Sequence, residues 1–271
     1  MKRAIVIIIL IAISITGLFL MANMALHTKV QPTTVQTSVY QEDIKIPILM
    51  FHNIEANISN SFESTEVTPE EFEETLKAIK DNGYTTISLD QLNEIYNTGK
   101  STIKKPIVIT FDDGYLSNYE YAFPMLKKNG MKANIFIVTS NVGKEPGLFP
   151  HFTWDQAKEM EDSGLIEIHN HTNLHKTADS LSDEEFLESV RDAQTDLEKN
   201  LGKRKVKALA YPEGKYNDFL ITKLKDEGFK LQFTVDKGLN SLKDKPDKLK
   251  RINVAHFEGG KNIIYLINRH K

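Results

Sequence analysis

The sequence predicts an α/β fold, a distorted (β/α) barrel of about seven to eight mainly parallel strands, preceded by one transmembrane helix. Three observations lead to this prediction. Short apolar runs alternate with segments of helical pattern from residue 44 onward, and helix-capping residues open several of those segments. The chain has 271 residues, of which 40% are hydrophobic, which is enough for one sizeable domain with its own core.

The expected strands are apolar runs at residues 46–51, 85–89, 106–111, 133–138, 165–169, 208–211, 231–235 and 251–254. The expected helices begin at Thr68, near Gln91, near Tyr119, near Trp154, at Ser182 and at Asp218. In a parallel barrel, reactive side chains gather at the C-terminal ends of the strands. The polar residues that follow each run are therefore the candidates for chemistry.

The N-terminus has the pattern of a membrane anchor. Lys2 and Arg3 precede a largely apolar, uncharged run over residues 4–22, and a helix of that length spans roughly 30 Å, the thickness of a hydrocarbon core. Basic residues at its start keep the N-terminus inside, so the remainder is expected to be extracytoplasmic. Cleavage of a signal near Ala22 or Ala25 is the alternative, which would make the protein secreted.

Three regions follow from this pattern. Residues 1–26 are expected to form a single-pass anchor in the cell membrane, or a signal. Residues 27–43 are rich in Thr, Gln and Val and are expected to form a tether. Residues 44–271 are expected to form the folded domain.

The composition limits the chemistry. The formal net charge is −3, from 34 Lys and Arg against 37 Asp and Glu, so no electrostatic footprint for nucleic acid is present. No protein partner is evident in the sequence either. The chain has no cysteine, which excludes disulfides and thiolate ligands and leaves His and carboxylates to hold any metal.

The run at residues 107–111 leads directly into Asp112, Asp113 and Gly114. Two adjacent carboxylates after a buried strand are costly unless something satisfies them. Because successive side chains project in different directions, one acid can bind a metal while its neighbour faces a reacting water. Capping of the next helix would explain the same residues, and the acidic pair alone does not decide between the two.

A second cluster follows the run at 165–169 and contains His171 and His175. Their spacing puts both imidazoles on one face if the segment makes a helical turn. Two histidines and one carboxylate form a three-ligand metal site with an open position for water. A surface loop that happens to contain histidines is the structural alternative, and the acidic pair favours the metal site.

Two further strand ends carry candidate residues. In the segment Tyr211-Pro212-Glu213-Gly214, Pro restricts the preceding residue and Gly loosens the turn, so a main-chain amide can point into a cleft. On its own this segment is an ordinary turn. His52 follows the first apolar run and would lie on the same face of a barrel, although a single His there is more often structural.

Together these motifs resemble the polysaccharide deacetylases of carbohydrate esterase family 4, the NodB-homology domain, from about Ile46 to the end of the chain. The Thr-Phe-Asp-Asp-Gly motif at 110–114 and the His-Thr-Asn-Leu-His motif at 171–175 carry this resemblance. His52 ahead of the acidic motif, with a Tyr-Pro-x-Gly turn after the histidines, resembles the branch that contains the poly-N-acetylglucosamine deacetylases. In that branch the family motifs are circularly permuted.

The resemblance implies a divalent metal, with zinc as the expected ion, held by Asp113, His171 and His175. It implies that Asp112 is the general base that deprotonates the attacking water. It also implies that His52 is the general acid that protonates the leaving amine.

The chain departs from the family in three places. Ala210 stands where an Arg commonly braces the base, and Arg251 is the candidate replacement. Glu213 stands where an aromatic residue is common, so oxyanion support from the turn after Tyr211 rests on the main-chain amide. The late histidine motif is not clearly present, and its best match, His256, is the alternative general acid.

The implied function is metal-dependent removal of N-acetyl groups from an N-acetylglucosamine polymer, either cell-wall peptidoglycan or poly-N-acetylglucosamine. Amide hydrolysis needs an activated water, a polarised carbonyl and a proton donor, and the sequence offers a candidate for each. A metal-dependent O-acetyl esterase and a non-catalytic carbohydrate-binding surface protein are the alternatives. The pairing of Asp112 with Asp113 argues against the non-catalytic alternative, and a glycosidase would place its two carboxylates several ångströms apart.

Overall fold

A computed structural model describes residues 39–40, 44–58 and 64–270 of the chain. The expected membrane anchor and most of the expected tether lie outside these residues. Within the described part of the chain, no helix has the length and apolar character needed to cross a membrane.

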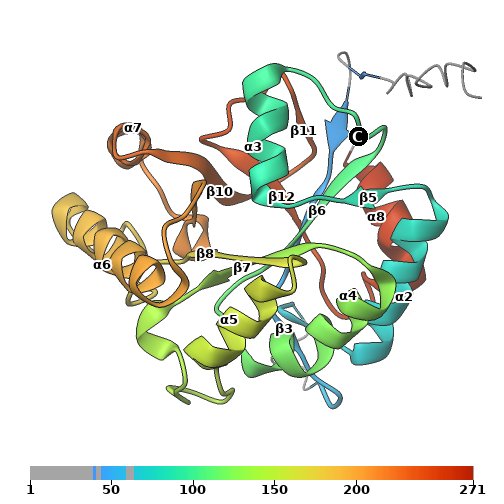
Figure 1. The fold of residues 1–271 in the computed structure, drawn as a ribbon, viewed down its shortest axis with the longest axis horizontal. Helices are drawn as coiled ribbons and strands as arrows, with labels where there is room; N and C mark the ends of the chain where they lie inside the picture. The colour runs from blue at the N-terminus through green and yellow to red at the C-terminus, as the bar shows by residue number, and fades with distance from the viewer. Residues whose placement is uncertain (1–38, 41–43, 59–63, 271) are drawn as a thin grey trace, which may run out of the picture. The chain divides into compact units, whose positions relative to one another are not determined.

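Seven parallel strands close into a barrel (Figure 1), in the order β2-β12-β10-β9-β8-β7-β6, with β6 pairing back to β2. These strands are β2 (Ile48–Phe51), β6 (Pro106–Phe111), β7 (Ala133–Ile137), β8 (Ile166–Asn170), β9 (Lys207–Ala210), β10 (Phe229–Lys237) and β12 (Leu249–Asn253). An eighth, β5 (Thr85–Thr86), pairs with the start of β6. The expected barrel of mainly parallel strands is therefore confirmed.

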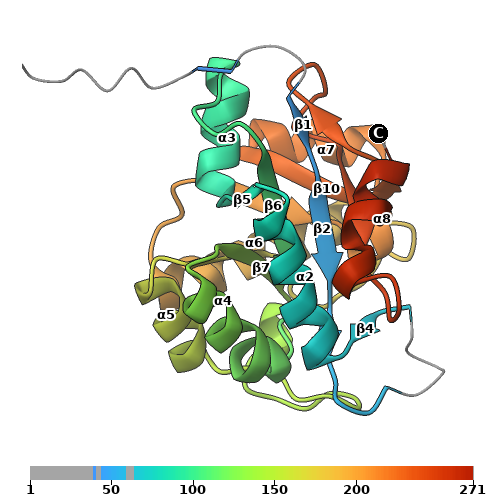
Figure 2. The same cartoon turned by 90° about the vertical axis from the view of Figure 1, so that its right-hand side faces the viewer.

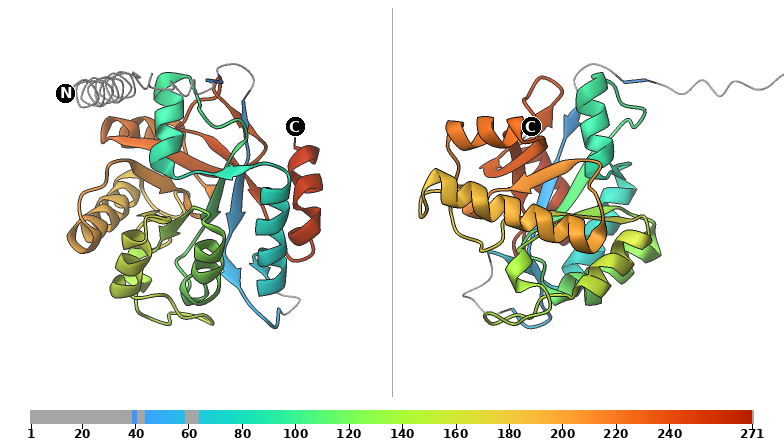
Figure 3. Two further views of the ribbon diagram at one scale, coloured as in Figure 1. Left: turned by 45° about the vertical axis from the view of Figure 1, so that its right-hand side comes forward. Right: turned by 60° about the vertical axis from the view of Figure 1, so that its left-hand side comes forward.

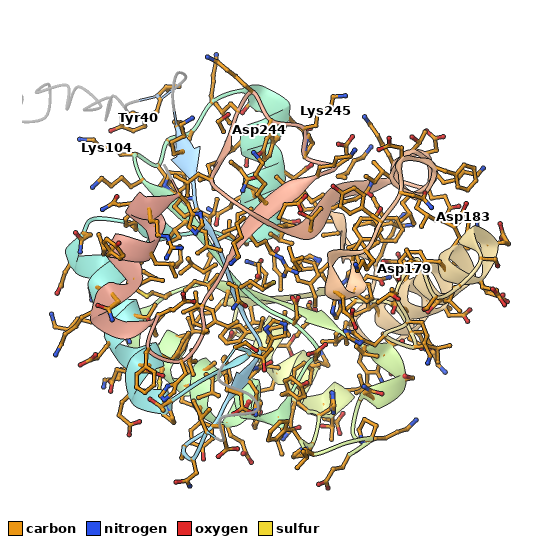
Figure 4. All side chains as sticks on the ribbon, turned by 180° about the vertical axis from the view of Figure 1, so that it is seen from behind. Tyr40, Lys104, Asp179, Asp183, Asp244 and Lys245 are labelled. Carbon is orange, nitrogen blue, oxygen red and sulfur yellow. The ribbon has the colours of Figure 1, made fainter. Side chains whose placement is uncertain are left out.

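Helices surround the strands on the outside of the barrel (Figures 2 and 3). They are α2 (Pro69–Asp81), α3 (Leu89–Thr98), α4 (Phe123–Asn129), α5 (Trp154–Asp162), α6 (Asp183–Leu201), α7 (Asp218–Asp226) and α8 (Ile263–Arg269), with short turns η1 (Asn118–Ala122), η2 (Thr139–Asn141), η3 (Pro212–Gly214) and η4 (Gly260–Asn262). Capping boxes at Thr68, Ser88, Thr153 and Ser182 fix where four of the helices begin. Asp183, the first residue of α6, is labelled in Figure 4.

Helix α3 explains why the second expected strand is short. Ser88 caps α3 and accepts a hydrogen bond from the Gln91 N–H, so the backbone turns helical at Leu89 instead of continuing as a strand. Leu92 and Ile95 of α3 belong to the same buried cluster as barrel residues such as Phe136, so α3 closes one end of the barrel.

The opposite end of the barrel carries the site. Strand β2 runs away from the α3 end toward β4 (Figure 2), and the other barrel strands are parallel to it. At the α3 end, β1 (Lys45–Ile46) pairs antiparallel with β11 (Asn240–Ser241), close to Tyr40 and Asp244 in Figure 4. At the other end, β3 (Asn53–Ile54) pairs with β4 (Glu66–Val67). The C-terminal ends of the barrel strands therefore meet near β3 and β4.

Candidate active site

The acidic motif forms a tight turn after β6. The Asp112 N–H donates to the Phe51 carbonyl at 2.9 Å, which continues the pairing with β2. The chain then turns sharply, because Asp113 has a φ of 70° and Gly114 a φ of 86°. A Cβ at Gly114 would lie 2.9 Å from the Ile137 side chain, so only glycine fits here. The turn directs the two neighbouring carboxylates differently: Asp112 is buried and Asp113 is half-buried.

His171 is held in one tautomer at the end of β8. Its Nδ1 lies 2.7 Å from the Ala210 carbonyl oxygen, which can only accept, so Nδ1 carries the proton. The Nε2 lone pair is then available on the side of Asp113, whose Oδ1 is 3.6 Å away. Burial lowers the pKa of His171 to about 4, so the ring is neutral at neutral pH, the form that binds metals.

His175 reaches the same point by a route that the sequence did not predict. Residues 171–175 are not helical, because Thr172 and His175 have φ values of 66° and 53°. The Thr172 hydroxyl accepts from the His175 N–H at 3.0 Å and closes the turn. The segment therefore does not make the helical turn that would have put both imidazoles on one face, yet the two rings still come together, with centroids 4.9 Å apart.

The geometry of these three side chains fits a metal ion. One ligand atom each from Asp113, His171 and His175 lies within 4.8 Å of the others. Around a tetrahedral zinc with bonds of about 2.0–2.1 Å, neighbouring ligand atoms are about 3.3–3.4 Å apart. Asp113 Oδ1 lies 3.3 Å from His175 Nε2 and 3.6 Å from His171 Nε2. His175 is 37% exposed, so the group is open to solvent on one side.

Arg251 forms a buried bidentate pair with Asp112. Nη1 and Nη2 donate to the two carboxylate oxygens at 2.7 and 2.8 Å, and Nε donates to the Thr234 carbonyl at 2.9 Å. Burial would raise the pKa of Asp112, but Arg251 and then His171 outweigh it and hold the pKa below the ordinary value. Asp112 is therefore ionised at neutral pH and fixed in orientation.

A cleft of about 690 Å³ opens beside these groups, and His52, Asp113 and His175 all line it. His52 Nδ1 is buried, and none of the described residues forms a hydrogen bond with it. By contrast, His256 does not line this cleft, because its Nδ1 pairs with Glu71 Oε2 at 2.9 Å, at the start of α2. Of the two candidate acids, the structure therefore places His52 beside the acidic pair.

Among the described residues that line the cleft, none belongs to the Tyr-Pro-x-Gly turn. Glu213 is exposed and has a φ of 51°, and a Cβ at Gly214 would collide with Val235. The Tyr211 side chain is buried between α6 and α7, stacked on Phe186. Any support of an oxyanion from this turn would thus come from the Glu213 amide, and Tyr211 acts through packing.

Glu66, Tyr115 and His151 also line the cleft, and none of the three has a role predicted from the sequence. Glu66 lies in a segment without strand periodicity, and only the pairing of β4 with β3 brings it to the cleft. Tyr115 and His151 form an isolated bridge, with ring centroids 5.0 Å apart. No spacing in the sequence predicts the pairing of Glu66 with Asn53 or that of Tyr115 with His151.

Comparisons with known sequences find polysaccharide deacetylases. The polysaccharide deacetylase family matches residues 99–232. A putative polysaccharide deacetylase of Bacillus subtilis, YxkH, is 33% identical over 215 residues, covering 79% of this chain and 73% of the relative. A poly-β-1,6-N-acetyl-D-glucosamine N-deacetylase of Staphylococcus aureus is 29% identical over 208 residues, covering 69% of this chain and 71% of the relative.

Solved structures show the same fold. The Streptococcus pyogenes deacetylase PplD, in complex with acetate, superposes with a TM-score of 0.74 at 29% identity, covering 83% of this chain and 98% of that one. IcaB from Ammonifex degensii gives a TM-score of 0.73 at 25% identity, covering 83% and 97%. On the strength of the Bacillus relative and the family match, the chain belongs to the polysaccharide deacetylase family of hydrolases.

Proposed function

We propose that the chain is a metal-dependent N-deacetylase of polysaccharides that contain N-acetylglucosamine. The observation that carries this proposal is the group Asp113, His171 and His175, with ligand atoms within 4.8 Å, beside the buried Asp112. The Staphylococcus aureus relative is named for its action on poly-β-1,6-N-acetyl-D-glucosamine, which makes that polymer the first substrate to test. Cell-wall peptidoglycan is the second.

The residues divide the reaction between them. A divalent ion, with zinc as the expected one, would supply a Lewis acid for the acetyl carbonyl and lower the pKa of water. Asp112 takes a proton from the attacking water, and Arg251 holds this carboxylate ionised and oriented for that transfer. The amide of Glu213 donates to the developing oxyanion.

His52 completes the proton transfers. When the carbon–nitrogen bond breaks, the nitrogen must receive a proton, because an amine leaves far more easily than an amide anion. His52 lines the cleft with Asp113 and His175, so it can reach that nitrogen, whereas His256 is held by Glu71. The products are acetate and a sugar with a free amine.

Acetate release from an N-acetylglucosamine pentamer tests the residue roles. We expect a chelator and Asp112→Asn each to abolish release, and His52→Ala to slow it by about 10²–10⁴-fold. His256→Ala is the matched control and should retain the wild-type rate. If His52→Ala released acetate at the wild-type rate, His52 would not be the general acid. Release from O-acetylated but not N-acetylated oligomers would favour an esterase.

The location of the protein is a separate proposal. The basic start and the apolar run at residues 4–22 support a single-pass anchor in the cell membrane, with the catalytic domain extracytoplasmic. Protease added to intact cells should then digest the domain while the protein stays in the membrane fraction. A soluble secreted form that begins after Ala25 would instead show a cleaved signal.

A further inference from the structure

The cleft has polar residues that the proposed hydrolysis does not use. Glu66, Tyr115 and His151 line it together with His52 and Asp113. Its volume of about 690 Å³ lies in the range of pockets that enclose a whole small ligand. A polymer therefore has room for sugar atoms beside the acetamido group that is hydrolysed.

Glu66 is held in place by a relay of uncharged groups. Strand β4 pairs with β3 so that Glu66 lies opposite Asn53, whose Nδ2 donates to Glu66 Oε1 at 3.3 Å. The Ser117 hydroxyl donates to Asn53 Oδ1 at 2.6 Å. Because that hydroxyl occupies the amide oxygen, the Asn53 amide nitrogen is directed to Glu66. The relay orients the carboxylate without neutralising it.

No Lys or Arg in the described part of the chain pairs with the Glu66 carboxylate, whose side-chain partner is the uncharged Asn53. Glu66 is only 1% exposed, and burial together with the Glu55 carboxylate raises its pKa, with only the Asn53 hydrogen bond acting against them. None of the described residues that line the cleft is Lys or Arg. The other acids are balanced, Asp112 by Arg251 and Asp113 by the proposed metal.

A buried carboxylate without a cation is costly, so this position favours a ligand that brings positive charge. We propose that Glu66 anchors a subsite for a protonated glucosamine unit, next to the N-acetylglucosamine unit whose acetyl group is hydrolysed. The inference rests on the proposed N-deacetylation, because that reaction turns neutral acetamido groups into primary amines. A protonated amine offers three hydrogen-bond donors and a positive charge, whereas the acetamido nitrogen offers one donor and carries no charge. Polymer that has already lost acetyl groups is therefore the preferred substrate.

Defined tetrasaccharides test this preference with the full-length, metal-loaded chain in detergent. The reference tetrasaccharide contains only N-acetylglucosamine. In a second set, one N-acetylglucosamine unit is replaced by glucosamine, at each position in turn. In a third set, the same unit is replaced by neutral glucose. The wild-type kcat/KM for acetate release should be about tenfold or more higher for at least one glucosamine-containing substrate than for its glucose counterpart. Glu66→Gln should reduce that ratio to about one, and Glu66→Asp, which keeps the charge, should retain part of it.

Glu145→Gln is the matched control, because Glu145 is an exposed loop acid that does not line the cleft. It should keep both the wild-type rate and the ratio. An equal kcat/KM for all substrates, or a ratio that survives Glu66→Gln, would overturn the proposal. A purely structural role of Glu66 would lower both rates together and leave the ratio unchanged, which also overturns it.

Inhibition of the wild-type protein gives a readout that needs no variant. The fully de-N-acetylated tetrasaccharide should compete with substrate more strongly than an all-glucose tetrasaccharide, and added salt should weaken the difference. Equal inhibition by both would contradict the subsite. If no tetrasaccharide releases acetate, the proposed deacetylation fails, while binding of the glucosamine tetrasaccharide, measured by calorimetry, still decides the subsite.

Discussion

Replacing Arg251 by Met should destabilise the fold by about 3–5 kcal/mol, the usual cost of removing one partner of a buried ion pair. The Arg251 side chain is 0% exposed and Asp112 is 3% exposed, so water does not replace the guanidinium. The substitution removes the two charge-assisted hydrogen bonds at 2.7 and 2.8 Å and the bond to the Thr234 carbonyl. Without Arg251, nothing from that residue opposes the effect of burial, which raises the pKa of Asp112. The acid limb of the pH–rate profile should therefore move to higher pH.

A double-mutant cycle measured by urea unfolding isolates the cause. Asp112→Asn removes the charge that Arg251→Met leaves behind, so the double variant should lose less stability than the sum of the two single losses, by about 1–3 kcal/mol. Met is chosen because it is unbranched and adapts to the space left by the Arg stem. An Arg251→Met loss below about 1 kcal/mol, or strict additivity in the cycle, would refute the account of a structurally required pair.

Three further predictions concern helix capping, the oxyanion turn and the metal. Burial raises the pKa of Glu71, but the hydrogen bonds that Glu71 accepts outweigh burial and lower its pKa in the folded state below 4.5. Glu71→Gln should therefore lower the free energy of unfolding by about 1–3 kcal/mol at pH 7, and by less as the pH falls below 4.5. An equal loss in urea unfolding at pH 7 and pH 4 would contradict this. Gly214→Ala should cost roughly 2–5 kcal/mol because its Cβ would lie 2.8 Å from the Val235 nitrogen. At Gly130, which has a similar φ, an added Cβ would have no atom of the described residues within 4 Å, so Gly130→Ala should cost only about 1–2 kcal/mol. Equal costs would refute the steric argument. Zinc at about 100 times its Kd should stabilise the metal-free chain by about 2.7 kcal/mol in thermal unfolding, and a response that survives His175→Ala would place the metal elsewhere.

The alternation of apolar runs with capped helices was sufficient to predict the barrel, because helical crossovers join its consecutive parallel strands everywhere except between β10 and β12 in the described part of the chain. Boundaries were less predictable where two signals overlap. At residues 85–89 the apolar pattern favours a strand, but the Ser88 capping box begins α3 at Leu89. Helix α8 was not predicted, since no side chain caps its start at Asn262.

Site residues that directly follow a strand could be predicted from the sequence. Site residues that reach the site only through tertiary contacts could not. Asp113, His171 and His175 come together after strand ends, as the sequence indicates, although Thr172 and His175 have positive φ values and the segment makes no helical turn. Arg251 was inferred only from a missing Arg elsewhere, and its pairing with Asp112 needed the fold, because the two residues are 139 positions apart.

The most direct test of the central claim is the mass of an N-acetylglucosamine pentamer after incubation with the zinc-loaded chain, with zinc-loaded Asp112→Asn in parallel. We expect stepwise loss of acetyl groups, each with a new primary amine, with the wild-type protein and not with Asp112→Asn. An unchanged pentamer with folded, zinc-loaded wild-type protein, or equal acetyl loss with Asp112→Asn, would contradict it.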